Sequence, residues 1–201
     1  MTRDAAEGSV DPYPDVRMGA RFALILAAGL TVSYAVIFLV LATPGRSVGM
    51  GLYASLGLGT ALLMLSYIDL RTGLLLDIIT LPLILAGFGV TILLGASWQL
   101  SIAGALIGYG AIAALSWFWR HVRGYEGIGL GDAKLLAAGG AWVGAGLLPV
   151  VLLIASGLGI ISAFTVSQRT QSRRDQLAIP FGPHLSLGIW SAWCITEMIF
   201  P

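Results

Sequence analysis

A series of apolar stretches, each long enough or nearly long enough to cross a lipid bilayer, dominates this chain. A helix needs roughly 20 apolar residues to cross a hydrocarbon layer of about 30 Å. Charged or turn-forming residues separate seven such stretches, at about 20–42, 50–68, 78–95, 101–119, 133–147, 148–166 and 184–200. Only 10% of the 201 residues are charged, against roughly 25% in soluble domains. The sequence therefore predicts an all-α integral membrane protein, a polytopic bundle of about seven transmembrane helices.

The segment 133–166 can be read as one helix or as two. A single helix would be about 50 Å long, which is too long even for a steeply tilted span. Pro149 and the neighbouring glycines permit a turn. We therefore expect two helices in this segment.

Basic residues indicate how the bundle is oriented. Of the basic residues that adjoin the predicted spans, nine fall on one side and one, Arg46, falls on the other. By the positive-inside rule the N-terminus is cytoplasmic and the C-terminus lies outside. Reading 133–166 as one helix would place the basic loop 169–174 outside, so the charge pattern independently supports two helices.

The chain is expected to form a single transmembrane domain at 19–201, preceded by a polar cytoplasmic tail at 1–18. The tail lacks the pattern of a cleaved signal peptide. A net charge of +1 argues against a nucleic-acid partner. The lone Cys194 excludes an internal disulfide or a cysteine cluster for a metal.

Small residues recur every four positions in two of the spans, a spacing that lets helices approach closely in lipid. These residues are Gly51, Ser55 and Gly59 in one span, and Gly104 and Gly108 in another. We interpret them as packing surfaces.

Two aspartates stand out among the few ionisable residues near the spans, where such side chains are costly and usually functional. Asp69 closes the second span and Asp132 opens the fifth, so the topology brings them to the same cytoplasmic depth. Glycines at 127, 129 and 131 precede Asp132 and would let a backbone, such as a substrate strand, pass close by. The alternative is a flexible loop that ends in an acid favoured by the helix dipole.

A pair of carboxylates in a low-dielectric site can hydrolyse a peptide bond without a cofactor or metal. Both cannot ionise easily, so one keeps its proton well above the usual pKa and the two titrate together. One then acts as a base on water, while the other, which is protonated, polarises the peptide carbonyl and later protonates the leaving amine.

Three segments of the chain resemble, in order, the motifs of the type IV prepilin peptidases, bacterial membrane aspartic proteases with a GxGD motif. The segment "GIGLGDAKLLAAGGAWVG" is similar to the region of their second catalytic aspartate, and "IDLRTGLLLDIITLPLILAG" to that of the first. The third is "IPFGPHLSLG" at 179–188. The resemblance covers about residues 50–200 and implies that Asp69 and Asp132 are the catalytic pair. One departure is Leu75-Leu76, where the family often has Ile-Pro, so the loop after Asp69 can differ in shape.

The resemblance implies a GxGD aspartic protease fold and an endopeptidase that cuts the leader from prepilin or pilin-like precursors. The work would take place at the cytoplasmic face of the bacterial inner membrane, in a type IV pilus or secretion system. The precursor would have a basic leader followed by an apolar helix, and membrane lipid would be the other partner. The chain resembles the shorter, peptidase-only members that process Flp-type pilins, so no N-methyltransferase domain and no cofactor are expected.

Several residues in and around the motifs are candidates for binding the substrate or supporting the site: Gly129, Gly131, Lys134, Asp77 and Glu126. Lys134 could hold an acid or a substrate carbonyl, or extend to the interface as an ordinary cytoplasmic lysine. Asp77 could be a helix N-terminal acid or order the loop. We interpret His184 as a helix-end or interfacial residue.

Two other functions fit parts of the pattern. A small proton- or cation-coupled transporter could also use Asp69 and Asp132, but these acids are expected at one face rather than near the midplane. A non-catalytic assembly factor of a pilus or secretion system would keep the fold without turnover. The presence of both aspartates argues against that reading.

Overall fold

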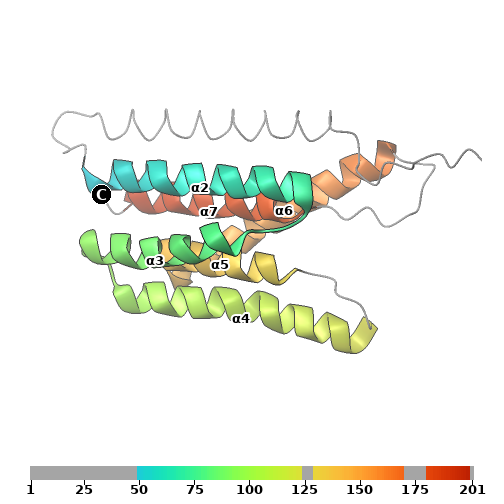
Figure 1. Ribbon diagram of the computed structural model, residues 1–201, viewed down its shortest axis with the longest axis horizontal. Coiled ribbons are helices and arrows are strands. Elements are labelled where there is room, and N and C mark those ends of the chain that lie inside the picture. Colours follow the sequence, from blue (N-terminus) through green and yellow to red (C-terminus); the bar gives the residue numbers. More distant parts are fainter. Residues whose placement is uncertain (1–48, 124–128, 170–179, 200–201) are drawn as a thin grey trace, which may run out of the picture.

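All regular structure in the described part of the chain is helical. The computed structural model describes residues 49–123, 129–169 and 180–199. In chain order they form helices α2 to α7 and one short 3-10 helix, η1 (Figure 1). The bounds are α2 Met50–Thr72, α3 Asp77–Leu93, α4 Trp98–Arg123, α5 Leu130–Val143, η1 Ala145–Leu147, α6 Leu148–Arg169 and α7 Gly182–Ile199.

Three of the described helices are long and apolar enough to cross a membrane by length and composition. These segments are Gly51–Thr72, Trp98–Val122 and Ala145–Phe164, and α3 is a shorter apolar helix. The prediction of a helical membrane protein is confirmed at this level. The predicted first span, 20–42, lies outside the described residues, so the count of seven stays a prediction.

The segment 133–166 contains two helices, as the sequence predicts. Helix α5 ends at Val143, and Gly144 then adopts a φ of 76°. Residues other than glycine rarely adopt such a φ. The chain continues through η1 into α6. The start was predicted less well, because α5 begins at Leu130 rather than at 133 and therefore includes Asp132 in its first turn.

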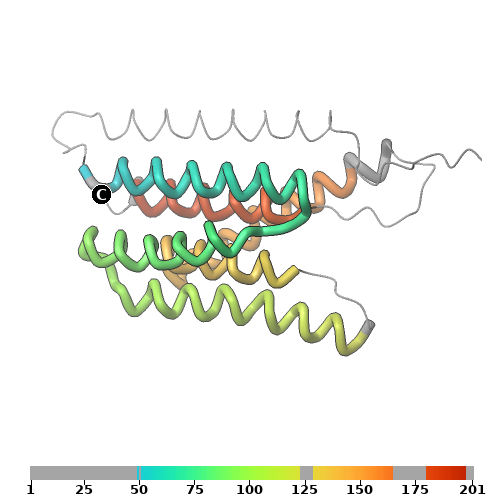
Figure 2. Tube along the Cα trace, in the orientation of Figure 1, coloured from blue at the N-terminus to red at the C-terminus, as the bar shows by residue number. Residues whose placement is uncertain are grey.

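Helix α5 is the centre of the bundle. It packs against α3, α4 and α7, while α2 and α6 both pack against α7. The trace in Figure 2 shows α5 between α4 on one side and α7 on the other. Every residue from Leu135 to Val143 is buried, as expected for a helix that is apolar on all sides.

Glycines allow α4 and α5 to approach closely. A Cβ atom at Gly108 would lie 2.6 Å from the carbonyl oxygen of Leu136, and one at Gly104 would collide with the backbone of Gly140. Real Cβ atoms essentially never come so close. The small-residue spacing in the span 101–119 is thus confirmed as a packing surface.

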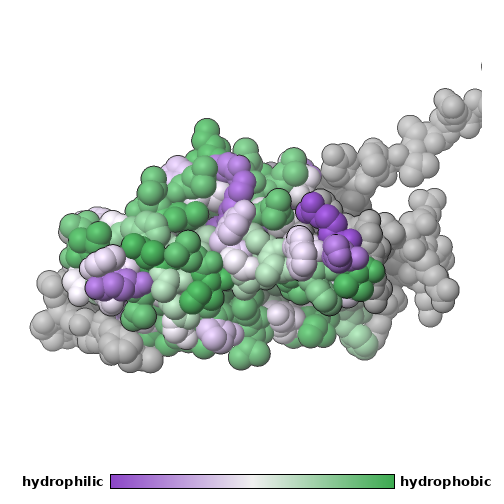
Figure 3. All heavy atoms as spheres, turned by 90° about the horizontal axis from the view of Figure 1, so that it is seen from below, coloured by the Kyte–Doolittle hydropathy of each residue, from purple (hydrophilic) through white to green (hydrophobic). Residues whose placement is uncertain are grey.

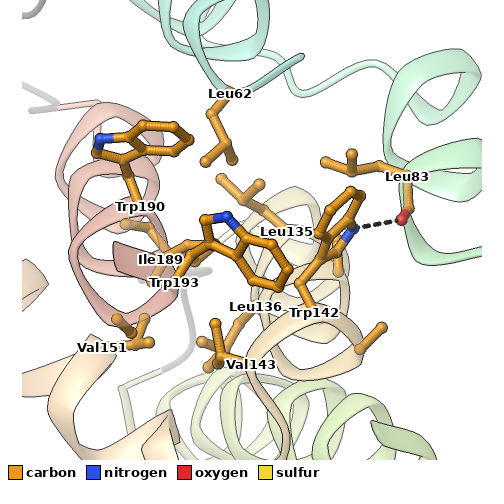
Figure 4. Packing of buried hydrophobic residues seen from close by; sticks show 14 of the residues in the cluster. Leu62, Leu83, Leu135, Leu136, Trp142, Val143, Val151, Ile189, Trp190 and Trp193 are labelled. Atoms are coloured by element: carbon orange, nitrogen blue, oxygen red, sulfur yellow. Dashed lines mark hydrogen bonds between the residues drawn. The ribbon is translucent and has the colours of Figure 1, made fainter. Parts of the chain in front are cut away.

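Tryptophans from two helices join the core (Figure 4). The rings of Trp142 and Trp193 meet edge to face with their centroids 5.3 Å apart. The Trp142 indole N–H donates to the Leu83 carbonyl at 2.8 Å, and that of Trp193 donates to the Ser55 hydroxyl at 2.8 Å. These bonds satisfy the buried polar ends of the rings and tie α5 to α3 and α7 to α2.

The outer surface is mostly apolar. Figure 3 shows apolar residues over much of the face seen from below, with polar residues in separate small groups. Large side chains such as Leu85, Ile107 and Leu153 are well exposed. Such a surface suits contact with lipid rather than water.

Candidate active site

Asp69 lies in the last turn of α2 and is held from the opposite helix. Gly73 ends α2 with a φ of 64° and donates its N–H to the Asp69 carbonyl at 2.8 Å. The Asp69 side chain is buried, and its Oδ2 accepts the Gly182 N–H at 3.0 Å. A carboxylate is unfavourable at the C-terminal end of its own helix, but here it faces the N-terminal end of α7, where negative charge is stabilised.

Asp132 lies in the first turn of α5, a position where the helix dipole favours an acid. Its N–H donates to the carbonyl of Gly129 at 3.1 Å. Burial, and then the nearby charge of Asp69, raise the pKa of Asp132 from 3.8 to about 7. The effect of Asp69 on Asp132 shows that the two carboxyl groups interact electrostatically.

Helix geometry places the two aspartates at the same level of the bundle. Helices α5 and α7 begin at the same end of the bundle and run in the same direction (Figure 1). They touch at Gly139 and Ile189, since a Cβ at Gly139 would lie 2.6 Å from Ile189 Cγ1. Asp132 and Gly182 each precede this contact by seven residues, which is about two turns and about 10.5 Å. Asp132 therefore lies level with Gly182, whose N–H binds Asp69.

An ion pair joins the helices that flank the site. Lys134 Nζ lies 2.7 Å from Asp77 Oδ1 and 2.6 Å from Asp77 Oδ2. The contact links the first turn of α5 to the first turn of α3. Among the contacts considered from the sequence, Lys134 binds an acid, which is Asp77. Asp77 is the N-terminal acid of α3, and its ion pair connects α3 to α5.

The glycines before Asp132 have different roles, which corrects part of the sequence interpretation. Gly129 is extended and exposed at the N-cap of α5, as a slot for a passing backbone would require. Gly131 is already helical, and a Cβ there would lie 2.9 Å from the Leu75 Cβ. Its missing side chain lets the 73–76 loop pack on α5 rather than leaving room for a substrate. Glu126 and Gly127 lie outside the described residues.

The sequence marked 179–188 as a segment similar to a family motif, but it assigned no residue of α7 to the site. The Gly182 amide has no side-chain signature, although Pro183 next to it is typical of a helix start. His184 was expected at a helix end or interface, and it is buried in the first turn of α7. Among the described residues, no three His, Cys, Asp or Glu side chains are grouped to hold a metal ion.

These features define a helical membrane protein that carries two carboxyl groups at the same end of its bundle. The model of the type IV leader peptidase family matches residues 56–164 of the chain. The chain therefore belongs to the type IV leader peptidase family, which confirms the resemblance seen in the sequence motifs. Together with the three apolar helices, this membership indicates a bacterial inner-membrane protein.

Similar proteins carry the name prepilin leader peptidase/N-methyltransferase. The protein from Burkholderia pseudomallei is 44% identical over 174 residues, which cover 85% of this chain and 53% of the relative. The Aeromonas salmonicida protein is 38% identical over 87% of this chain and 58% of its own length. The Escherichia coli K12 protein is 47% identical over 63% of this chain and 56% of its own length. The chain thus spans about half the length of these curated relatives. No solved structure matches it significantly.

Proposed function

We propose that this protein is an aspartic endopeptidase that removes the short leader from prepilin or pilin-like precursors. Asp69 and Asp132 are its catalytic pair. Membership of the type IV leader peptidase family and the names of its relatives support this activity. The observation that carries the assignment is the position of Asp132 level with the Gly182 N–H that binds Asp69.

The chemistry follows from the different surroundings of the two carboxyl groups. We assign Asp69 as the base that takes a proton from the attacking water, because its Oδ2 accepts the Gly182 N–H and Asp132 is the group that holds a proton near neutral pH. Asp132, with its pKa raised to about 7, holds a proton near neutral pH and gives it to the carbonyl oxygen of the scissile bond. When the tetrahedral gem-diol intermediate collapses, the C–N bond breaks and the proton taken by Asp69 passes to the leaving amine. One hydroxyl proton of the intermediate returns to Asp132 as the new carboxyl group forms.

The precursor would approach from the lipid. Its apolar helix can lie beside the bundle, while the polar leader stays in the cytoplasm and passes the end that carries both aspartates. The exposed Gly129 leaves room for that backbone, and the Lys134–Asp77 pair holds the first turns of α3 and α5 in place around it. The cytoplasmic location of this end rests on the distribution of basic residues. Glu126 stays a candidate for substrate contact.

N-methyl transfer, the second activity in the relatives' name, needs a separate test. These relatives are named as N-methyltransferases as well as peptidases. The prediction that this chain acts as a peptidase alone is tested by the mass of the product, since methylation of the new N-terminus adds about 14 Da.

Processing in cells tests the proposal. Precursor should accumulate uncleaved when the protein carries Asp69→Asn or Asp132→Asn, because neither variant can complete proton transfer. Glu197→Gln is the matched control, since Glu197 packs beside Gly51 at the other end of α2 and should leave processing unchanged. Processing at the wild-type rate by both aspartate variants would refute the assignment.

A further inference from the structure

His184 connects two helices through both nitrogens of its ring. It is only 3% exposed. Its Nδ1 lies 3.2 Å from the carbonyl oxygen of Pro180, and its Nε2 lies 2.7 Å from the hydroxyl of Ser162 on α6. A carbonyl can only accept, so Nδ1 carries a hydrogen and, in a neutral ring, Nε2 accepts from Ser162. The ring therefore ties α6 to the chain just before α7.

That piece of chain is the one that binds Asp69. Gly182 lies between Pro180 and His184, and its N–H donates to Asp69 Oδ2 at 3.0 Å. Phe181 stacks on the His184 ring, with the ring centroids 6.3 Å apart and an angle of 22° between the ring planes. The segment is thus fixed at its carbonyl and at its aromatic side chain by one imidazole.

The attachment is short. Only φ and ψ of Phe181 separate the Pro180 carbonyl from the Gly182 N–H, and the Phe181 ring itself stacks on His184. Holding both the Pro180 carbonyl and the Phe181 ring therefore restricts where the Gly182 N–H points. Hydrogen bonds weaken steeply as their angle departs from linearity, so a small rotation here would loosen Asp69.

We propose that His184 is a positioning residue, which aims the Gly182 N–H at Asp69 by holding Pro180 to α6. The inference rests on the proposed function of Asp69 as a catalytic base. His184 does not touch the reacting atoms and acts only through the Gly182 amide. A misplacement of about 1 Å at a catalytic group can lower the rate by about a hundredfold.

Three substitutions separate the two hydrogen bonds of the ring. His184→Asn keeps a donor near the position of Nδ1, His184→Gln keeps a polar group near that of Nε2, and His184→Phe keeps the ring volume without either. We expect kcat of the Phe variant to fall by roughly 10- to 100-fold with KM unchanged. The Asn variant should recover more kcat than the Gln variant, because only Asn can reach Pro180. His121→Phe is the control, since His121 is exposed and stacks on Trp117.

Hydrogen exchange gives a readout that does not depend on activity. Pro180 and Pro183 have no amide hydrogen, so in a peptide covering 180–184 only Phe181, Gly182 and His184 have exchangeable backbone amides. Exchange at Gly182 should be faster in His184→Phe and restored in His184→Asn. If wild type cleaves no precursor, the proposed function fails while the exchange data still test the positioning.

The results that overturn the inference are specific. If wild type cleaves and His184→Phe retains the wild-type kcat, His184 does not position Asp69. If the Phe variant does not fold, the comparison of Asn with Gln decides. A Gln variant at least as active as the Asn variant would show that the bond to Pro180 is not the one that matters.

Discussion

Replacing Asp132 by asparagine should abolish cleavage and yet stabilise the folded protein above neutral pH. Burial and the charge of Asp69 raise the pKa of Asp132 from 3.8 to about 7. Each pKa unit is worth about 1.36 kcal/mol, so ionising Asp132 in the folded protein costs at most about 4 kcal/mol. Asparagine has nearly the shape of the carboxyl group but no charge, so the variant avoids this cost.

The sign of the effect fixes its pH window. The folded protein keeps the Asp132 proton up to about pH 7, whereas the unfolded chain releases it near pH 3.8. Wild-type stability therefore falls as the pH rises between these values and this loss is complete above about 7. The difference in unfolding temperature between Asp132→Asn and wild type should widen from pH 4 to pH 7 and then stay constant.

Thermal unfolding in detergent micelles measures this difference. The chain has one cysteine, the half-buried Cys194, so a thiol-reactive fluorescent dye reports its exposure without a further label. A difference that does not change with pH would contradict the reasoning. So would a wild-type protein that is more stable than Asp132→Asn at pH 8.

Two further predictions concern the frame around the site. Because Lys134 and Asp77 are partly exposed, removing either charge should lower the unfolding free energy by less than about 1 kcal/mol. Exchanging the two charges should restore the lost stability. Additive effects in a double-mutant cycle would contradict this prediction. Gly108→Leu should cost about 1–3 kcal/mol because its Cβ would meet the Leu136 carbonyl at 2.6 Å. Gly110→Leu, with nothing within 4 Å, is the control, and equal unfolding temperatures for the two would refute the packing argument.

Much of the frame could be predicted from the sequence because it depends on patterns that lipid imposes. Apolar runs located the helices, and Gly104 and Gly108 marked a close helix contact. The turn at Gly144 followed from the length limit on a membrane helix. The alternating direction of the spans also predicted that Asp69 and Asp132 share one end of the bundle. In Figure 1 the C-terminal end of α2 and the N-terminal end of α5 lie at the same end.

The finer structure of the site could not be predicted in this way. The Gly182 N–H is a backbone donor, and no residue type signals where such a donor points. The role of Gly131 depends on Leu75, a residue distant in sequence that approaches only after α3 packs on α5. His184 lies at a helix end, as the sequence predicts. Its contacts could not be predicted, because Ser162 lies on another helix and Pro180 lies before α7.

A reaction with purified components tests whether Asp69 and Asp132 together cleave a prepilin leader. Wild-type protein, Asp69→Asn and Asp132→Asn are reconstituted in liposomes with a prepilin from the same cell, and the products are analysed by intact mass. We expect one new N-terminus with the wild type and uncleaved precursor with each variant. Cleavage at the same bond and rate by either variant would contradict it.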